Sequence, residues 1–157
     1  MVQKILFVCL GNICRSPAAE GIFRQKIKER HLEEFFVVDS AGTGGWHVGN
    51  LADPRMREIA LSRGIELTSR SRQIEANDLY EFDHILVMDK DNLDAVKSLI
   101  EDQLHPVNSK IKLILSYCKN SQLDEVPDPY YGGRNGFNKV LDLLNDAIDE
   151  LIDTLIE

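Results

Sequence analysis

The chain has 157 residues, of which 43% are hydrophobic, a size and composition typical of one globular domain with a buried core. Its net charge of −8 disfavours general binding to nucleic acid or to an anionic membrane. Its apolar runs are too short to cross a membrane, nothing at Met1 resembles a signal peptide, and three cysteines do not make a disulfide framework. We therefore expect one domain over residues 1–157 in the reducing cytoplasm, with no nucleic-acid partner and no membrane span.

Apolar runs alternate with helical patterns through the first half of the chain. Residues 3–9 contain a short, uniformly apolar run, Ile5-Leu6-Phe7-Val8, which predicts a buried strand over residues 3–9. Apolar side chains at helical spacing predict a helix over residues 16–31. A second apolar run, residues 35–38, leads into a glycine-rich loop over residues 39–46, and residues 54–63 have the pattern of a short helix.

The same alternation continues in the second half. Residues 84–88 predict a third strand with Asp89 at its carboxyl end, and residues 91–100 predict a helix. Residues 111–115 predict a fourth strand. Residues 124–133 contain two prolines and two glycines, which exclude regular structure there.

The last stretch, residues 137–155, has the clearest amphipathic helical pattern in the chain. Strands that alternate with helices predict an α/β domain whose parallel sheet is covered by helices on both faces. Such sheets bind ligands beyond the carboxyl ends of their strands. Cys9, Ser40 and Asp89 all fall at that end, so we expect the functional site there.

The loop between the first predicted strand and the first predicted helix carries the chemistry. Ser16 is a candidate N-cap and Pro17 suits the first helical position, so loop N–H groups and the helix dipole favour an anion here. Five residues separate Cys9 from Arg15, whose guanidinium can hold two phosphate oxygens while a thiolate attacks phosphorus. No Gly-Lys-Ser/Thr ends the loop, so it is not a Walker A loop. The combination predicts phosphoryl transfer through a phosphocysteine.

Each of these residues also has a structural explanation. Cys9 alone fits a buried small hydrophobe, but a purely structural role does not explain Arg15 at a helix start, where its charge opposes the dipole. Gly11 permits a positive φ, a close approach of the backbone to the anion, or a simple turn. The hydroxyl of Ser16 either caps the helix or donates to the thiolate.

Phosphoryl transfer from an ester oxygen also needs an acid for the leaving group. Asp128, restrained between Pro127 and Pro129, is the candidate; the alternative is an ordinary surface turn. Three aromatic residues either wall the site for a flat substrate or fill the core: Trp46, Tyr130 and Tyr131. The four histidines have no metal-ligand spacing, so we assign no chemistry to His31, His47, His84 and His105 and expect neither metal nor cofactor.

Together these segments resemble the low-molecular-weight protein tyrosine phosphatase family. The resemblance runs from Lys4 to the final helix. Its matching segments are residues 7–17, 39–43, 71–73, 88–89 and 128–131. Many members carry a histidine where this chain has Ser69, in the hydrogen-bond network that braces the loop.

The resemblance implies a single three-layer phosphatase domain with a four-stranded parallel sheet, of the flavodoxin-like or Rossmann-like kind. It implies metal-free hydrolysis of phosphotyrosine and small aryl phosphates, with Cys9 as nucleophile, Arg15 as phosphate clamp and Asp128 as acid, then base. Supporting roles fall on Ser16 at the thiolate, on Ser40 with Asn12 in the loop brace, and on Asp89. The expected substrate-binding residues are Leu10, Gly11, Asn12, Ile13, Cys14, Trp46, Tyr130 and Tyr131.

The implied partners are phosphotyrosine-containing proteins, with phosphate or another oxyanion bound in the site, and the implied assembly is a monomer or weak dimer. In related protein-arginine phosphatases a threonine stands where this chain has Ile13, and isoleucine favours tyrosine. The resemblance also implies redox sensitivity: a sulfenic acid at Cys9 would be captured by Cys14 as a disulfide. The alternative is that Cys14 is a packed small residue behind the loop.

Three other functions are open to a chain of this pattern. Thioredoxin-coupled arsenate reductase shares the fold and the Cys/Arg loop but needs two further cysteines, and only Cys118 lies outside the loop. A flavodoxin-like module that binds an anion or a flavin phosphate explains the glycine-rich loop but not Cys9 with Arg15 and Asp128. An interaction protein without activity would tolerate Cys9→Ser.

Overall fold

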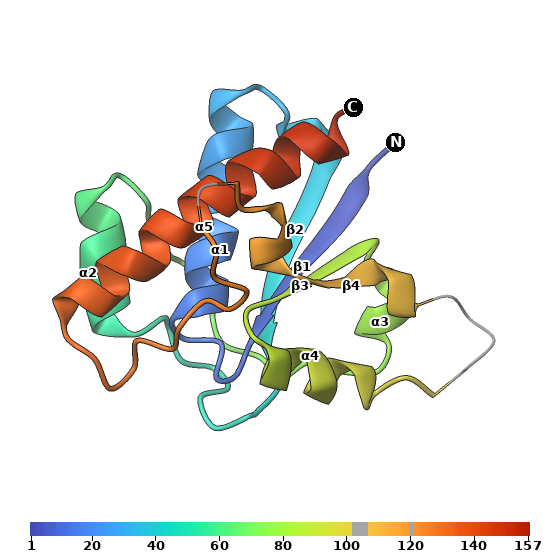
Figure 1. Ribbon diagram of the computed structural model, residues 1–157, viewed down its shortest axis with the longest axis horizontal. Helices are drawn as coiled ribbons and strands as arrows, with labels where there is room; N and C mark the ends of the chain where they lie inside the picture. The colour runs from blue at the N-terminus through green and yellow to red at the C-terminus, as the bar shows by residue number, and fades with distance from the viewer. Residues whose placement is uncertain (102–106, 120) are drawn as a thin grey trace.

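Four parallel strands form the sheet on which the chain is built, in the order β2-β1-β3-β4 (Figure 1). The computed structural model describes residues 1–101, 107–119 and 121–157. The strands are β1 Gln3–Cys9, β2 Phe36–Gly42, β3 His84–Val87 and β4 Ile111–Leu113. The four-stranded parallel sheet expected for the α/β fold is confirmed.

Helices cover both faces of this sheet, as the sequence predicts. The α-helices are α1 Arg15–Glu29, α2 Pro54–Ser62, α3 Asp78–Glu81, α4 Lys90–Lys97 and α5 Arg134–Leu155. Three short 3₁₀ helices span Glu33–Phe35, Asn108–Lys110 and Ile114–Tyr117. Helices α1, α2 and α5 lie on one face, and α3 and α4 lie on the other (Figure 1).

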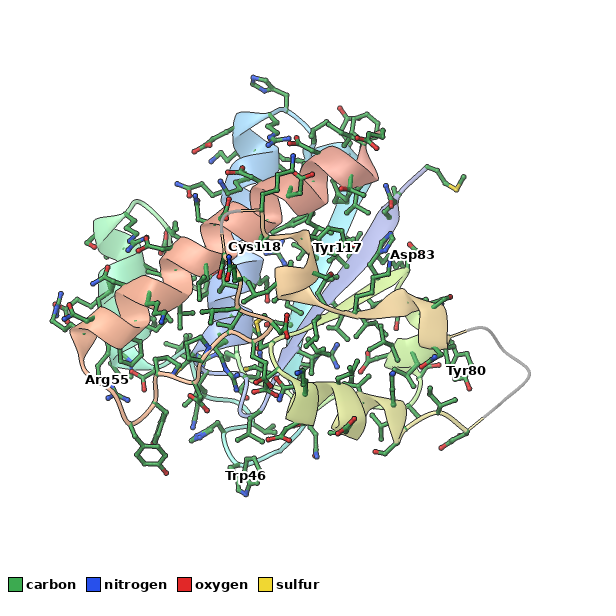
Figure 2. The ribbon with its side chains drawn as sticks, in the orientation of Figure 1. Trp46, Arg55, Tyr80, Asp83, Tyr117 and Cys118 are labelled. Atoms are coloured by element: carbon green, nitrogen blue, oxygen red, sulfur yellow. The ribbon has the colours of Figure 1, made fainter. Side chains whose placement is uncertain are left out.

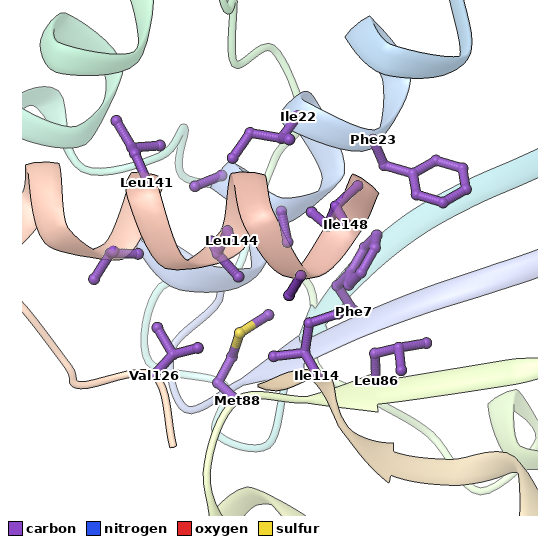
Figure 3. Packing of buried hydrophobic residues seen from close by; sticks show 14 of the residues in the cluster. Phe7, Ile22, Phe23, Leu86, Met88, Ile114, Val126, Leu141, Leu144 and Ile148 are labelled. Carbon is purple, nitrogen blue, oxygen red and sulfur yellow. The ribbon is translucent and has the colours of Figure 1, made fainter. Parts of the chain in front are cut away.

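Strand β1 shows why both faces are covered. Because successive side chains of a strand point to opposite faces, Phe7 packs into the core beneath α1 and α5, while Leu6 and Val8 pack into the core beneath α3 and α4. All three are fully buried. In Figure 3, Ile148 of α5 lies close to Phe7.

Three strands differ in their bounds from the sequence-based prediction, and of these β3 differs least, ending at Val87 and not at residue 88. Strand β2 was predicted over residues 35–38 but extends to Gly42, because pairing continues along β1 until Gly42 lies opposite Cys9. The predicted glycine-rich loop is therefore strand up to Gly42. The fourth strand was predicted over residues 111–115 but ends at Leu113, because Ile114 turns into a 3₁₀ helix and packs under α5 (Figure 3).

The start of α1 is also shifted from the prediction. The N-cap is Cys14 and the helix begins at Arg15, so the prediction of Ser16 as N-cap and Pro17 as first helical residue is wrong. Ser16 is fully buried, and its hydroxyl bonds to side chains of the preceding loop instead of a helix N–H. The tertiary contacts of the loop thus override the local capping preference of serine.

The strand order decides where ligands bind. The chain passes from β1 to β2 on one side and then crosses back to β3 on the other side of β1, and such a reversal of strand order opens a crevice at the carboxyl ends of these strands. Cys9 ends β1, Gly42 ends β2, and Asp89 follows β3 by two residues as the N-cap of α4. Within the described ranges, none of the helices has the length and apolar character that crossing a membrane requires.

Candidate active site

A tight loop after β1, residues 9–15, forms the floor of the candidate site. Its one left-handed residue is Asn12, with φ of 56°, whereas Gly11 is not in the positive-φ region that was one possibility for it. Asparagine tolerates this conformation because its short amide can bond to nearby groups. A Cβ at position 11 would lie 3.1 Å from Cδ2 of His47, a tight contact that would require the His47 ring to shift slightly.

The sulfur of Cys9 sits at the centre of this loop. It is 2% exposed and accepts a hydrogen bond from the backbone N–H of Asn12 at 3.3 Å. Ser16 Oγ lies 3.0 Å from the sulfur. The same oxygen accepts from the Asn12 amide at 2.7 Å, and its hydroxyl hydrogen can be donated to the sulfur or, at 3.4 Å, to the carbonyl of Ala41. Two polar groups, the Asn12 N–H and the Ser16 hydroxyl, therefore converge on the sulfur of Cys9.

Asn12 joins the loop to the neighbouring strand. Its amide nitrogen donates to Ser16 Oγ and, at 3.0 Å, to Ser40 Oγ, while its amide oxygen accepts from the backbone N–H of Arg72 at 3.0 Å. Ser40 Oγ in turn donates to the buried carboxylate of Glu20 at 2.7 Å. The network is therefore closed by Glu20 and Arg72, and within the described residues Ser69 makes no hydrogen bond to it.

Arg15 lies at the first turn of α1 with only 2% of its surface exposed. Its Nη1 donates to Asp89 Oδ2 at 2.6 Å and to the carbonyl of Val126 at 3.0 Å. Within the described chain its Nε and Nη2 donate no hydrogen bond, and Arg15 lines the cavity beside Cys9. The side of the guanidinium that can grip two phosphate oxygens is thus available to a ligand.

The guanidinium of Arg15 stays charged although it is buried. Burial by itself lowers the pKa of this guanidinium, but negative charge at Cys9 and the hydrogen bond to Asp89 raise the pKa, and the balance is an increase. Asp89 thereby orients Arg15 and keeps it charged.

Backbone N–H groups add to this positive potential. Across the described residues, no backbone hydrogen bond is donated by four loop positions: Gly11, Ile13, Cys14 and Arg15. Such free amides at the start of a helix bind oxyanions. The loop therefore offers several donors, one cation and one thiol to a tetrahedral anion.

Asp128 belongs to the irregular loop between the end of β4 and α5. Its Oδ2 lies 3.6 Å from Arg15 Nη2, and its Oδ1 accepts from the backbone N–H of Tyr130 at 3.0 Å. The side chain is 44% exposed. Val126 anchors the loop by donating its N–H to the carbonyl of Met88 at 2.8 Å. The carboxyl group is thus held at the entrance of the site, opposite the thiol.

A cavity of about 330 Å³ collects these groups. It is lined by Cys9, Leu10, Gly11, Ile13, Cys14, Arg15, Trp46, His47, Asp128, Tyr130 and Tyr131. The other four candidates are not among its lining residues: Asn12, Ser16 and Ser40 lie buried behind the loop, and Asp89 holds Arg15. Trp46 is 70% and Tyr131 97% exposed, so they are rim residues and not core filler. Trp46 projects outward in Figure 2.

Three residues at the site, His47, Glu20 and Arg55, were not predicted from the sequence, and a fourth, Arg72, was included only through the matching segment 71–73. His47 lines the cavity, and its ring lies 6.3 Å from the ring of Tyr130. The sequence signal for His47 is that it directly follows Trp46, a predicted substrate-binding residue; the spacing of the histidines gives no such indication. Glu20, Arg72 and Arg55 are placed near the loops only by long-range contacts.

Metal ligation finds no support in the described part of the chain, where no group of three or more His, Cys, Asp or Glu side chains is arranged to hold an ion. His84 bonds to Gln3 at the far end of the sheet. His31 follows the end of α1. His105 lies outside the described residues.

Cys14 differs from Cys9 in its surroundings. Burial is the main cause that raises the pKa of the Cys14 thiol far above its ordinary value, and the charge of Asp53 adds to the increase. Cys14 is therefore a neutral thiol. It is reduced, as is Cys9, and both line the same cavity.

Comparisons with known proteins agree with this geometry. A family model described as "Low molecular weight phosphotyrosine protein phosphatase" matches residues 4–157. A putative low molecular weight protein-tyrosine-phosphatase of Synechocystis is 47% identical, over 98% of this chain and 96% of its own. The human low molecular weight phosphotyrosine protein phosphatase is 41% identical, over 88% of this chain and 86% of its own. A crystal structure of a protein tyrosine phosphatase from Entamoeba histolytica, with Hepes in its active site, superposes with a TM-score of 0.93 at 45% identity, covering 98% and 97% of the two chains.

Proposed function

Because the chain belongs to the low molecular weight phosphotyrosine protein phosphatase family, we propose that it hydrolyses phosphotyrosine through a phosphocysteine formed on Cys9. The observation that carries this proposal is the meeting of Cys9, Arg15 and Asp128 in one cavity. We further infer that residues 1–157 form a single phosphatase domain. Both β1, near one end of the chain, and α5, near the other, contribute to its core.

In the first step the phosphate monoester binds to the loop amides and to Nε and Nη2 of Arg15. The thiolate of Cys9 attacks phosphorus, the S–P bond forms, and the bond from phosphorus to the ester oxygen breaks. Asp128 gives its proton to that oxygen, so the tyrosine leaves as a neutral phenol. Arg15 and the amides stabilise the charge on the equatorial oxygens throughout.

In the second step water attacks the phosphocysteine. Asp128, now a carboxylate, takes a proton from the water, the S–P bond breaks, and the thiolate of Cys9 departs with inorganic phosphate as product. The hydroxyl of Ser16 and the N–H of Asn12 stabilise the departing thiolate, since each lies within hydrogen-bond reach of the sulfur.

The cavity walls favour an aromatic ester on a protein. Trp46, Tyr130 and Tyr131 surround the entrance with exposed aromatic surface, to which a flat ring can pack. Ile13, which lines the cavity, is apolar and suits the phenyl ring better than a charged phosphoguanidinium. The partners are accordingly phosphotyrosine-containing proteins.

Two alternatives have less support. In an arsenate reductase, Cys118 would have to relay electrons from the loop, but its sulfur bonds to Asp146 of α5 at 2.9 Å and is not among the cavity residues. An anion-binding module needs no acid at the entrance, and so leaves Asp128 unexplained.

The proposal is tested by hydrolysis of an aryl phosphate and of a phosphotyrosine peptide under reducing conditions. Turnover is expected to persist in chelator and to be inhibited by vanadate. An absence of turnover under reducing conditions overturns the proposal.

Replacement of Asp128 by alanine is expected to lower kcat/KM about 10²–10⁴-fold for phenyl phosphate, the usual scale for loss of a general acid. The loss should be much smaller for 2,4-dinitrophenyl phosphate, because that leaving group is stable without a proton. Steady-state kinetics with the two substrates measure the difference. Equal losses for both would remove Asp128 from the role of acid.

Peroxide is expected to inactivate the enzyme reversibly through a Cys9–Cys14 disulfide. Peroxide oxidises the Cys9 thiolate to a sulfenic acid, and the neutral thiol of Cys14 then condenses with it, releasing water. After treatment with peroxide and then a thiol reductant, the wild type and the control Cys118→Ser should regain activity, and Cys14→Ser should regain much less. The same recovery in all three shows that Cys14 is not a redox partner.

A further inference from the structure

Arg55 connects the two loops that form the candidate site. It lies in the first turn of α2, and Figure 2 shows it beside the segment that leads into α5. Its guanidinium makes three hydrogen bonds that divide between the loops. Two go to Asp53, whose own backbone is tied to the phosphate loop, and one goes to Tyr130, next but one to Asp128.

On the side of the phosphate loop, Arg55 makes a two-bond contact with Asp53, whose backbone is bonded to that loop. Asp53 donates its backbone N–H to the carbonyl of Ile13 at 2.7 Å, and its carboxylate is 6% exposed. Arg55 holds that carboxylate with Nε at 3.1 Å and Nη2 at 2.9 Å. Burial by itself raises the pKa of Asp53, but the hydrogen bonds from Arg55 more than offset this, and its pKa lies below the ordinary value. The pair is therefore ionic at neutral pH and geometrically defined.

The contact on the other side reaches the loop of the proposed acid. Arg55 Nη2 donates to the carbonyl of Tyr130 at 2.8 Å, and the guanidinium carbon lies 5.5 Å from the centre of the Tyr130 ring. The N–H of the same residue donates to Asp128 Oδ1 at 3.0 Å. Arg55 thus grips the residue whose backbone orients the carboxyl of Asp128.

The loop needs such a support because it has little of its own. Residues 121–131 contain no helix or strand. Before Asp128, the loop is anchored through Val126, which bonds to Met88 and to Arg15. After Asp128, and apart from the bond of the Asp128 carboxylate itself to the Tyr130 N–H, Arg55 is the only side chain in the described chain that hydrogen-bonds to residues 129–133.

We propose that Arg55 is a positioning residue that holds the Asp128 loop against the phosphate loop, so that the acid is aligned with the leaving-group oxygen. This inference rests on the proposed role of Asp128 as general acid. Lysine cannot replace Arg55, because one ammonium group cannot hold both carboxylate oxygens of Asp53 and reach the carbonyl of Tyr130 in a fixed geometry. Arg55 itself touches neither the substrate nor the reacting atoms.

The test compares kcat/KM for phenyl phosphate and for 2,4-dinitrophenyl phosphate, because this parameter reports the step in which the leaving group departs. Arg55→Met keeps an unbranched side chain but removes the guanidinium, whose carbon lies 4.8 Å from the centre of the Phe137 ring, and Arg55→Lys keeps a cation beside Asp53. Both are expected to lower kcat/KM for phenyl phosphate on the order of tenfold to a hundredfold, the scale for a misplaced catalytic group. The loss for the dinitrophenyl ester is expected to stay within about threefold, as is the change in the inhibition constant of inorganic phosphate.

Arg63→Met is the matched control. Arg63 caps the same helix and ties it to α5 through Asp142 and Asn138, but it does not contact the Asp128 loop. It is expected to leave both substrates within about twofold of wild type. Thermal melting identifies any variant that is not folded; if Arg55→Met is unfolded, the result for Arg55→Lys decides.

Asp128→Ala in the same series separates the two claims. If it shows no loss specific to phenyl phosphate, the proposed function fails at the acid. If it does show that loss while folded Arg55 variants lose nothing, or lose equally on both substrates, the proposed function survives and Arg55 is not a positioning residue.

Discussion

Replacement of Cys9 by serine is expected to abolish turnover while phosphate binding is retained. The hydroxyl of serine is not ionised at neutral pH and is a poor nucleophile toward phosphorus, so the loss should be on the order of 10⁶-fold, the scale for removal of a catalytic nucleophile. The groups that bind phosphate are unaffected, because Arg15 is held by Asp89 and by the carbonyl of Val126 and not by Cys9.

Two measurements check this result. Turnover of 4-nitrophenyl phosphate measures the nucleophile, and titration calorimetry with inorganic phosphate measures the binding site. Cys118→Ser, which changes the one cysteine outside the loop, should retain the activity of the wild type. If Cys9→Ser still hydrolyses an aryl phosphate at a rate near wild type, the phosphocysteine mechanism is wrong.

Replacement of Arg15 by lysine is the second large effect, with an expected loss in kcat/KM on the order of 10³-fold or more. An ammonium group is a point charge and cannot donate two parallel hydrogen bonds to phosphate. Lysine also cannot replace the bonds of Nη1 to Asp89 and to Val126 while reaching the substrate. The substitution therefore removes both the clamp and an anchor of the Asp128 loop.

Inhibition by inorganic phosphate should weaken together with kcat/KM in Arg15→Lys, which separates this variant from Cys9→Ser. Arg30→Lys provides the control, since among the described residues the ion pairs of Arg30 are only with exposed aspartates of α5. Near-normal activity of Arg15→Lys would show that Arg15 contributes general positive potential and no defined geometry.

The chemistry and the main elements follow from short stretches of sequence. Strand β1 was predicted with its observed bounds, Gln3–Cys9, because a short apolar run is decided by burial on both faces. Cys9 and Arg15 line the same cavity because they belong to one short loop, with five residues between them. Asp128 lines it too because its loop follows the last strand of the sheet. Local pattern is sufficient for features of this kind.

Other features were settled only by tertiary structure. Ser16 has the residue type of a helix cap, but its hydroxyl bonds beside Cys9 because the curled loop brings the sulfur within 3.0 Å. Strand β2 runs on to Gly42 because β1 lies alongside, although glycine and serine have little strand preference. In both cases a contact with another segment outweighs the local preference.

What determines the alignment of the site is a small number of contacts between distant parts of the chain. Arg15 and Asp89 are 74 positions apart, and Arg55 and Tyr130 are 75 apart. No periodicity or spacing encodes such pairs, because each depends on how the helices pack on the sheet and so on the whole core. The sequence by itself determines which reaction the groups can perform, and the packed fold decides which further residues, Glu20, His47 and Arg55 among them, stand beside them.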